Sequence, residues 1–80
     1  MEIKILGSGC SNCLRLEALV KEVAMEKDLE ATFLKVTDYR EIVGYGVMHT
    51  PGLVVNGKLL SAGRIPSKQE IATWLEAAGG

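Results

Sequence analysis

Residues 3–13 read IKILGSGCSNC and place Cys10 and Cys13 at C-x-x-C spacing; these are the only cysteines in the chain. The apolar run before them predicts a short strand, residues 7–9 predict a turn, and apolar residues recur at helical spacing from Ser11 onward. Cys10 is therefore expected at a helix N-terminus, where N–H groups without helical partners stabilise a thiolate, the reactive form of cysteine. The motif points to dithiol chemistry.

The first helix is predicted from about Ser11 to Lys27. Its inward stripe consists of Cys13, Leu16, Val20 and Val23, with Leu19 and Ala24 beside it. This places Cys13 on the buried face and leaves Cys10 at the exposed tip of the helix. We therefore expect the two thiols to differ in reactivity.

Two further elements follow this helix. Residues 31–36 predict a second strand, parallel to the first because a helix connects the two. Asp38 and Glu41 have capping-box spacing and predict a short helix that turns Ile42 and Val43 inward. The glycines at positions 44 and 46 are expected to end it.

The last part of the chain predicts a hairpin and a helix. Asn56-Gly57 lies between two apolar runs and accepts the positive φ angles of a type I′ turn. A second capping box, Ser67 to Glu70, opens a helix. Its predicted buried residues are Ile71, Trp74, Leu75 and Ala78. The expected order is β-α-β-α-β-β-α in a single α/β domain, residues 1–80.

Composition excludes several classes of function. The chain has 80 residues and a formal net charge of −1, with acidic and basic residues intermixed, so no basic patch indicates nucleic-acid binding. No apolar run approaches membrane-spanning length, and the first residues lack the layout of a signal peptide. We expect the protein to be a monomer in the cytoplasm. A purely structural disulfide is unusual in that compartment.

The C-x-x-C at the first strand-to-helix junction, with Thr50-Pro51 ahead of the hairpin, resembles the thioredoxin fold. More closely, the chain resembles the small thioredoxin- and glutaredoxin-like proteins of prokaryotes, also called redox-active disulfide proteins. The resemblance covers essentially the whole chain and is carried by residues 9–13, 47–52 and 55–58, followed by Gly63. It implies a minimal thioredoxin fold, a four-stranded mixed sheet flanked by helices.

The resemblance also implies roles for individual residues. Cys10 takes the position of the nucleophile, and Cys13 takes that of the cysteine that resolves the mixed disulfide. Pro51 takes the position of a cis proline that lies against the disulfide, and Thr50 would offer its backbone to an extended substrate chain. The implied function is that of a thiol–disulfide oxidoreductase that reduces disulfide-containing proteins, is recharged by an upstream reductase, and has no cofactor beyond its own disulfide.

The chain departs from the larger families at three points. Thioredoxins carry Trp-Cys-Gly-Pro-Cys, whereas here Ser11 and Asn12 stand between the cysteines, where they tune the thiolate and are expected to contact substrate. Lys4 stands where thioredoxins place a buried carboxylate, and it is either a buried tuner of Cys13 or a solvated strand residue. Residues 62–65 replace the Gly-Gly-x-Asp turn with which glutaredoxins help to hold glutathione.

Other interpretations of the same residues remain open. The cysteine pair could be a structural staple, or the thiols of a non-catalytic module that senses redox state or binds a soft metal. Zinc requires more ligands than one chain readily supplies, because only His49 adds a nitrogen donor, although two chains could share an ion. His49 is either a proton relay or, as we favour, an exposed loop residue. Val47 and Met48 belong either to a partner-binding surface or to the core.

Overall fold

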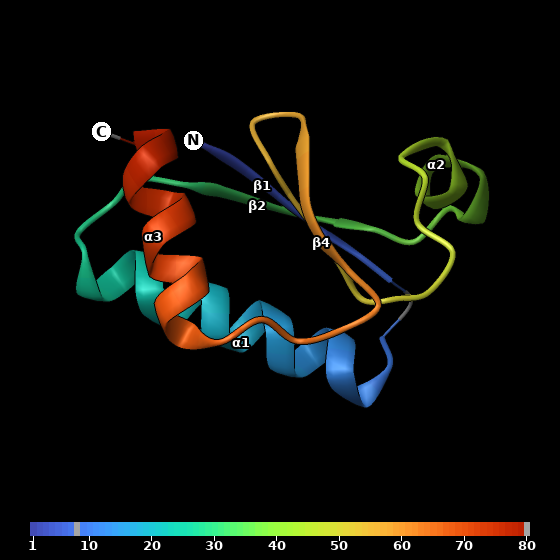
Figure 1. Cartoon of the computed structure of the whole chain (residues 1–80), viewed down its shortest axis with the longest axis horizontal. Coiled ribbons are helices and arrows are strands. Elements are labelled where there is room, and N and C mark those ends of the chain that lie inside the picture. Colours follow the sequence, from blue (N-terminus) through green and yellow to red (C-terminus); the bar gives the residue numbers. More distant parts are fainter. Residues whose placement is uncertain (8, 80) are drawn as a thin grey trace.

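The structure is a computed structural model that describes residues 1–7 and 9–79; Ser8 in the predicted turn and Gly80 lie outside it. Figure 1 shows a twisted sheet with two long helices packed against one face. The described elements are β1 (Glu2–Leu6), α1 (Ser11–Glu26), β2 (Thr32–Val36), α2 (Tyr39–Gly44), β3 (Gly52–Val55), β4 (Lys58–Ala62) and α3 (Lys68–Gly79). The predicted order of elements is confirmed.

The sheet has the strand order β2-β1-β3-β4. β1 pairs in parallel with β2 and antiparallel with β3, which in turn pairs antiparallel with β4. The predicted four-stranded mixed sheet is therefore correct, and α1 forms the crossover between the two parallel strands. The hairpin turn has positive φ at Asn56 (50°) and Gly57 (81°), as the sequence predicted.

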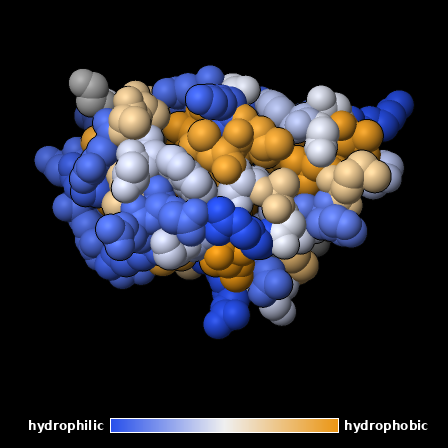
Figure 2. Space-filling model, in the orientation of Figure 1, coloured by the Kyte–Doolittle hydropathy of each residue, from blue (hydrophilic) through white to orange (hydrophobic). Residues whose placement is uncertain are grey.

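Side chains of the sheet alternate between two apolar clusters because successive residues of a strand point to opposite faces. On one face, Ile3 and Ile5 pack with residues of α1 and α3. On the other face, Leu6 packs with Ile42 of α2 and with neighbouring residues of the strands and loops. In Figure 2 hydrophobic residues gather along β4 and toward α2, whereas the surface over α3 is largely hydrophilic.

Of three predictions of burial, those for Val43 and Ala78 are wrong, and that for Trp74 is correct in part because Trp74 packs against the core cluster. Val43 is 40% exposed, because α2 has only six residues and turns Ile42 alone into the core. Trp74 is half-buried and Ala78 is exposed. Both line an open cavity of about 250 Å³ beside Val55 and Leu60. The end of α3 thus contributes less to the core than its helical spacing indicated.

The two predicted capping boxes form to different extents. In α3 the Ser67 hydroxyl accepts from the Glu70 N–H, and the Glu70 carboxylate accepts from the Ser67 N–H, both at 3.1 Å. In α2 the Asp38 carboxylate accepts from the Arg40 N–H at 2.8 Å. Among the described residues the carboxylate of Glu41 makes no return bond, so the box at α2 is half formed.

Candidate active site

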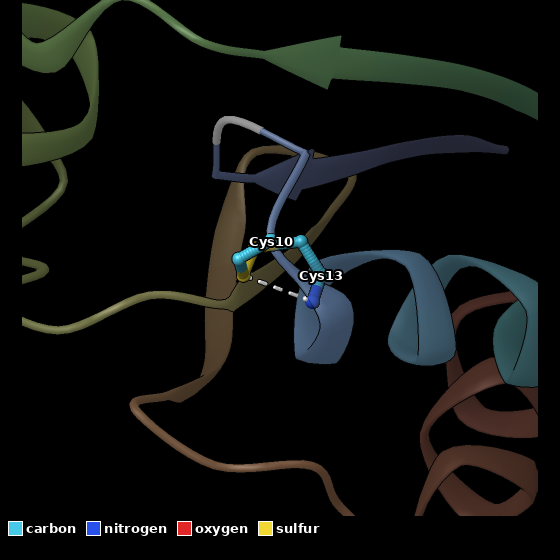
Figure 3. The surroundings of a disulfide bond; sticks show 2 residues. All are labelled: Cys10 and Cys13. Atoms are coloured by element: carbon cyan, nitrogen blue, oxygen red, sulfur yellow. Dashed lines mark hydrogen bonds between the residues drawn. A yellow bond between two sulfur atoms is a disulfide. The ribbon is translucent and has the colours of Figure 1, made fainter.

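Cys10 is the N-cap residue of α1. Its backbone is extended (φ −68°, ψ 160°), and its carbonyl accepts from the Leu14 N–H at 3.0 Å. Its Sγ accepts from the Cys13 N–H at 3.1 Å, the contact drawn in Figure 3. The first turn of α1 contains no acidic residue. The sulfur therefore receives both a backbone hydrogen bond and the positive end of the helix dipole, which favour a negative charge on it.

The two cysteines form a disulfide, with Cα atoms 5.0 Å apart. Cys10 is exposed, whereas Cys13 is 4% exposed and belongs to the buried stripe of α1. The predicted burial of Cys13 and exposure of Cys10 are therefore confirmed. Of the two residues, Cys10 is therefore the one that is accessible from solvent.

The segment before β3 lies beside the cysteines. The Thr50–Pro51 peptide bond is cis, Pro51 is buried, and Thr50 is exposed. Gly7 connects this segment with the disulfide: a Cβ atom built on Gly7 would lie 3.4 Å from both the Cys13 Cβ and the Thr50 Cβ. The tertiary structure thus brings together residues more than thirty positions apart in the sequence.

Thr50 has backbone groups available for an intermolecular partner. Within residues 1–7 and 9–79, its N–H and C=O make no hydrogen bond. The next carbonyl, that of Pro51, is already used, because it accepts from the Gly63 N–H at 2.9 Å. Thr50 is therefore the point at which an extended chain could add its own backbone hydrogen bonds to this edge of the site.

Exposed polar and apolar residues lie next to the cysteines and to Thr50 in the sequence. Ser11 and Asn12 are exposed in the first turn of α1. Met48 is 80% exposed and precedes Thr50 by two residues, while its neighbour Val47 is buried, so one residue of this pair belongs to the surface and the other to the core. Leu14, which follows Cys13 directly, is 51% exposed. Leu14 was not among the predicted site residues, although an apolar residue off the buried stripe and beside a cysteine was a usable signal.

His49 is exposed, as favoured from the sequence. Its neighbour in space is Gly63, since a Cβ atom at position 63 would lie 3.3 Å from the His49 Cβ. The histidine thus lies on the loop surface beside the cis peptide. Among residues 1–7 and 9–79, no group of three or more His, Cys, Asp or Glu side chains is arranged to hold a metal ion.

Lys4 matches neither of its two predicted states. Its side chain is 23% exposed, and its Nζ donates to the Tyr45 hydroxyl at 3.0 Å and lies 3.8 Å from the Glu2 carboxylate. The hydrogen bond with Tyr45 raises the pKa of Lys4. Because Lys4 alternates with Ile3 and Ile5, it points to the sheet face opposite α1, away from Cys13. It joins β1 to the loop after α2.

Comparison with known proteins agrees with this geometry. A family model described as "Thioredoxin domain" matches residues 1–76. A protein named "Thioredoxin" from Methanothermobacter thermautotrophicus is 41% identical over 71 residues, which cover 89% of this chain and 92% of the relative. A second protein of that name, from Methanocaldococcus jannaschii, is 36% identical over 75 residues, covering 94% of this chain and 86% of the relative.

Proposed function

This chain belongs to the thioredoxin domain family, and from that premise we propose a division of roles between its cysteines: Cys10 attacks and Cys13 resolves. The chain is a thiol–disulfide oxidoreductase, and its own disulfide serves in place of a cofactor. One observation carries the assignment of roles. The exposed sulfur caps α1, while the sulfur bonded to it belongs to a side chain that is 4% exposed.

In the first step the reduced protein acts through the Cys10 thiolate. The N–H of Cys13 and the N-terminus of α1 stabilise this anion, which raises the fraction of thiolate at neutral pH. The thiolate attacks one sulfur of a substrate disulfide. A Cys10–substrate disulfide forms, and the other substrate sulfur leaves as a thiolate that takes a proton from water.

In the second step the Cys13 thiol loses its proton and attacks the Cys10 sulfur. The bond between Cys10 and the substrate breaks, the Cys10–Cys13 disulfide forms, and the second substrate thiolate departs. Two electrons have then moved from the protein dithiol to the substrate. Burial of Cys13 keeps it from competing with Cys10 for incoming disulfides.

Substrate binding uses the exposed rim of the site. Within the described residues the Thr50 backbone makes no hydrogen bond, and its position next to cis Pro51 supports pairing with an extended segment of the substrate. Ser11 and Asn12 are exposed in the first turn of α1, directly after Cys10, and are proposed to contact the substrate there. Met48 and Leu14 add apolar contact area for the residues that flank the substrate disulfide.

The partners are disulfide-containing proteins on one side and a reductase on the other. We further propose that the chain acts as a monomer in the cytoplasm, without nucleic-acid or membrane partners, and that residues 1–80 form one domain. The net charge of −1 supports the absence of a nucleic-acid partner, and the family match over residues 1–76 supports a single domain. In the described part of the chain, no helix combines the length and hydrophobicity needed to cross a bilayer.

A trapping experiment tests the assigned roles. Reduced Cys13→Ser protein is expected to accumulate a covalent mixed disulfide with a disulfide-bonded protein such as insulin, because attack remains possible and resolution does not. Cys10→Ser is expected neither to trap insulin nor to reduce it with dithiothreitol beyond the uncatalysed rate. The double variant is the control for thiol-independent binding. Reductase activity in Cys10→Ser, or stronger trapping by Cys10→Ser than by Cys13→Ser, contradicts the assignment.

A further inference from the structure

Gly7 occupies the junction between β1 and the active-site turn. It follows Leu6, the last residue of β1, and its N–H donates to the Val36 carbonyl at 2.9 Å. This bond extends the pairing of β1 with β2 by one residue beyond the Leu6–Val36 pair. Gly7 is buried, with φ of 150°. The bond to the Val36 carbonyl therefore holds the backbone of Gly7 against β2.

The Cys13 sulfur occupies the space into which a side chain at position 7 would project. A Cβ atom at Gly7 would overlap the Cys13 Sγ, whereas its contacts with the Cys13 Cβ and the Thr50 Cβ would be ordinary at 3.4 Å. The sulfur is thus the one severe obstacle among these neighbours. The missing side chain at position 7, just after β1, makes the room in which the buried half of the disulfide lies.

The other glycine of the same turn differs in this respect. Gly9 also has positive φ, 71°, but a Cβ atom there would meet nothing within 4 Å. Both glycines adopt a positive φ that other residues rarely adopt, but only Gly7 leaves space for the Cys13 sulfur. Gly9 is therefore a matched control for backbone strain without the sulfur contact.

We propose that Gly7 is a positioning residue for the resolving step: it seats the Cys13 sulfur against the β1 backbone, within bonding reach of Cys10. This inference rests on the proposed roles of the two cysteines. Attack by Cys10 on a substrate does not involve the Cys13 sulfur, so a side chain at position 7 leaves that step intact. Resolution does involve it, because the Cys13 thiolate must align with the Cys10–substrate bond.

The effect of a side chain at position 7 follows from this geometry. In Gly7→Ala the Cys13 sulfur must rotate away or the first turn of α1 must shift. A misplacement of ~1 Å in a reacting group can slow a reaction about 100-fold. We therefore expect a variant that forms mixed disulfides normally and resolves them slowly.

The aromatic disulfide 5,5′-dithiobis(2-nitrobenzoate) separates the two steps. Attack by Cys10 releases one coloured thiolate at a rate proportional to reagent concentration, and attack by Cys13 releases the second at a rate independent of it. For reduced Gly7→Ala we expect a first rate constant within about twofold of the unmodified protein and a second that is at least about tenfold lower. Gly9→Ala is expected to retain both. An unchanged second phase in Gly7→Ala, or equal slowing of both phases, overturns the proposal.

Failure of the cysteine roles gives a different result. If Cys13 is the attacking thiol, Cys13→Ser loses the first release, whereas the proposed roles predict that it keeps the first and loses the second. That outcome is visible before any change at Gly7 is made. The result for Gly7→Ala then bears on positioning alone.

A double-mutant cycle keeps the proposal testable even where Gly7→Ala folds poorly. Urea unfolding of the reduced proteins compares the effect of Gly7→Ala in the unmodified chain with its effect in Cys13→Ala, which lacks the obstructing sulfur. We expect the shift in urea midpoint caused by Gly7→Ala to be clearly smaller in the Cys13→Ala background. An equal shift in both backgrounds shows that the sulfur is not what position 7 accommodates and contradicts the proposal.

Discussion

Helices α1 and α3 both begin with a side chain that accepts a hydrogen bond from the third residue of the helix. In α1 the acceptor is the Cys10 sulfur, which receives the Cys13 N–H at 3.1 Å. In α3 it is the Ser67 hydroxyl, which receives the Glu70 N–H at the same distance. The local requirement is shared, because the first N–H groups of any helix lack partners within it.

The two caps differ in what surrounds them. In α3 a carboxylate completes the cap: Glu70 accepts from the Ser67 N–H and forms a two-pronged ion pair with Arg64, at 3.1 and 2.8 Å. In α1 the corresponding third residue is Cys13, and the first turn has no acid. The positive end of α1 is therefore left for the sulfur. The structural cap and the reactive one therefore differ in the accepting atom, a hydroxyl oxygen or a sulfur, and in the carboxylate that only α3 carries.

Adding a carboxylate to the first turn of α1 tests the difference between the two caps most directly. In Asn12→Asp the new charge repels the Cys10 thiolate and raises the pKa of its thiol. We expect alkylation of reduced Cys10 by iodoacetamide at pH 7 to slow about three- to tenfold. The difference in alkylation rate between Asn12→Asp and the unmodified protein is expected to shrink at high pH, where the Cys10 thiol is ionised in both proteins. Rates measured across pH 5 to 10 test this.

The same substitution is expected to stabilise the oxidised protein, in which no thiolate is present. An acid in the first helical turn contributes about 0.3–1 kcal/mol. Asn56→Asp is the matched control: it makes the same change of charge at the hairpin, where the side-chain oxygen accepts from the Glu2 N–H at 2.9 Å. Equal alkylation rates for Asn12→Asp and the unmodified protein contradict the view that the first turn tunes Cys10.

Removing the cap of α3 is expected to change stability and leave the chemistry intact. Ser67→Ala loses the hydrogen bond to the Glu70 N–H, which typically costs about 1 kcal/mol. Urea unfolding of the oxidised protein measures this loss, and Ser67→Thr, which keeps the hydroxyl, is expected to restore most of it. A several-fold fall in reductase activity at unchanged stability indicates instead that the α3 cap shapes the active site.

A further prediction concerns the stability of the folded protein in acid. The Arg64 guanidinium, followed by the backbone of Ser67, lowers the pKa of the Glu70 carboxyl from 4.5 to about 2. A pKa depressed in the folded state contributes stability that is complete above the unfolded value and is lost as pH falls toward the folded one. Between pH 4.5 and 2 we expect the unmodified protein to lose more stability than Glu70→Gln. Glu30→Gln, at an exposed loop position, is the control, and parallel curves for Glu70→Gln and the unmodified protein contradict the prediction.

The elements and caps were predictable because their signals are local. The spacing of Cys13, Leu16 and Val20 defines the buried face of α1, and Asn56-Gly57 defines the hairpin turn. The unequal burial of the two cysteines follows from the same periodicity. None of these features needs information from a distant part of the chain.

The predictions from sequence failed where the burial of a side chain depends on which element packs against it. Val43 and Ala78 have the right spacing for the core, but within residues 1–7 and 9–79 no element covers them, and they remain exposed. Lys4 has strand spacing, yet its partner is Tyr45, forty-one positions away. Helical or strand periodicity predicts which residues share a face, but it does not predict whether another element packs against that face.

The amino-acid order by itself determined the redox pair, the helix that presents it and the sequence of elements, because hydrogen bonding and periodicity along the backbone act over a few residues. Only tertiary structure decided that Gly7, Cys13 and Thr50 meet at one point. That meeting arises when a single sheet aligns the end of β1 with the start of β3, and the gain that drives it, burial of apolar surface, belongs to the assembled core.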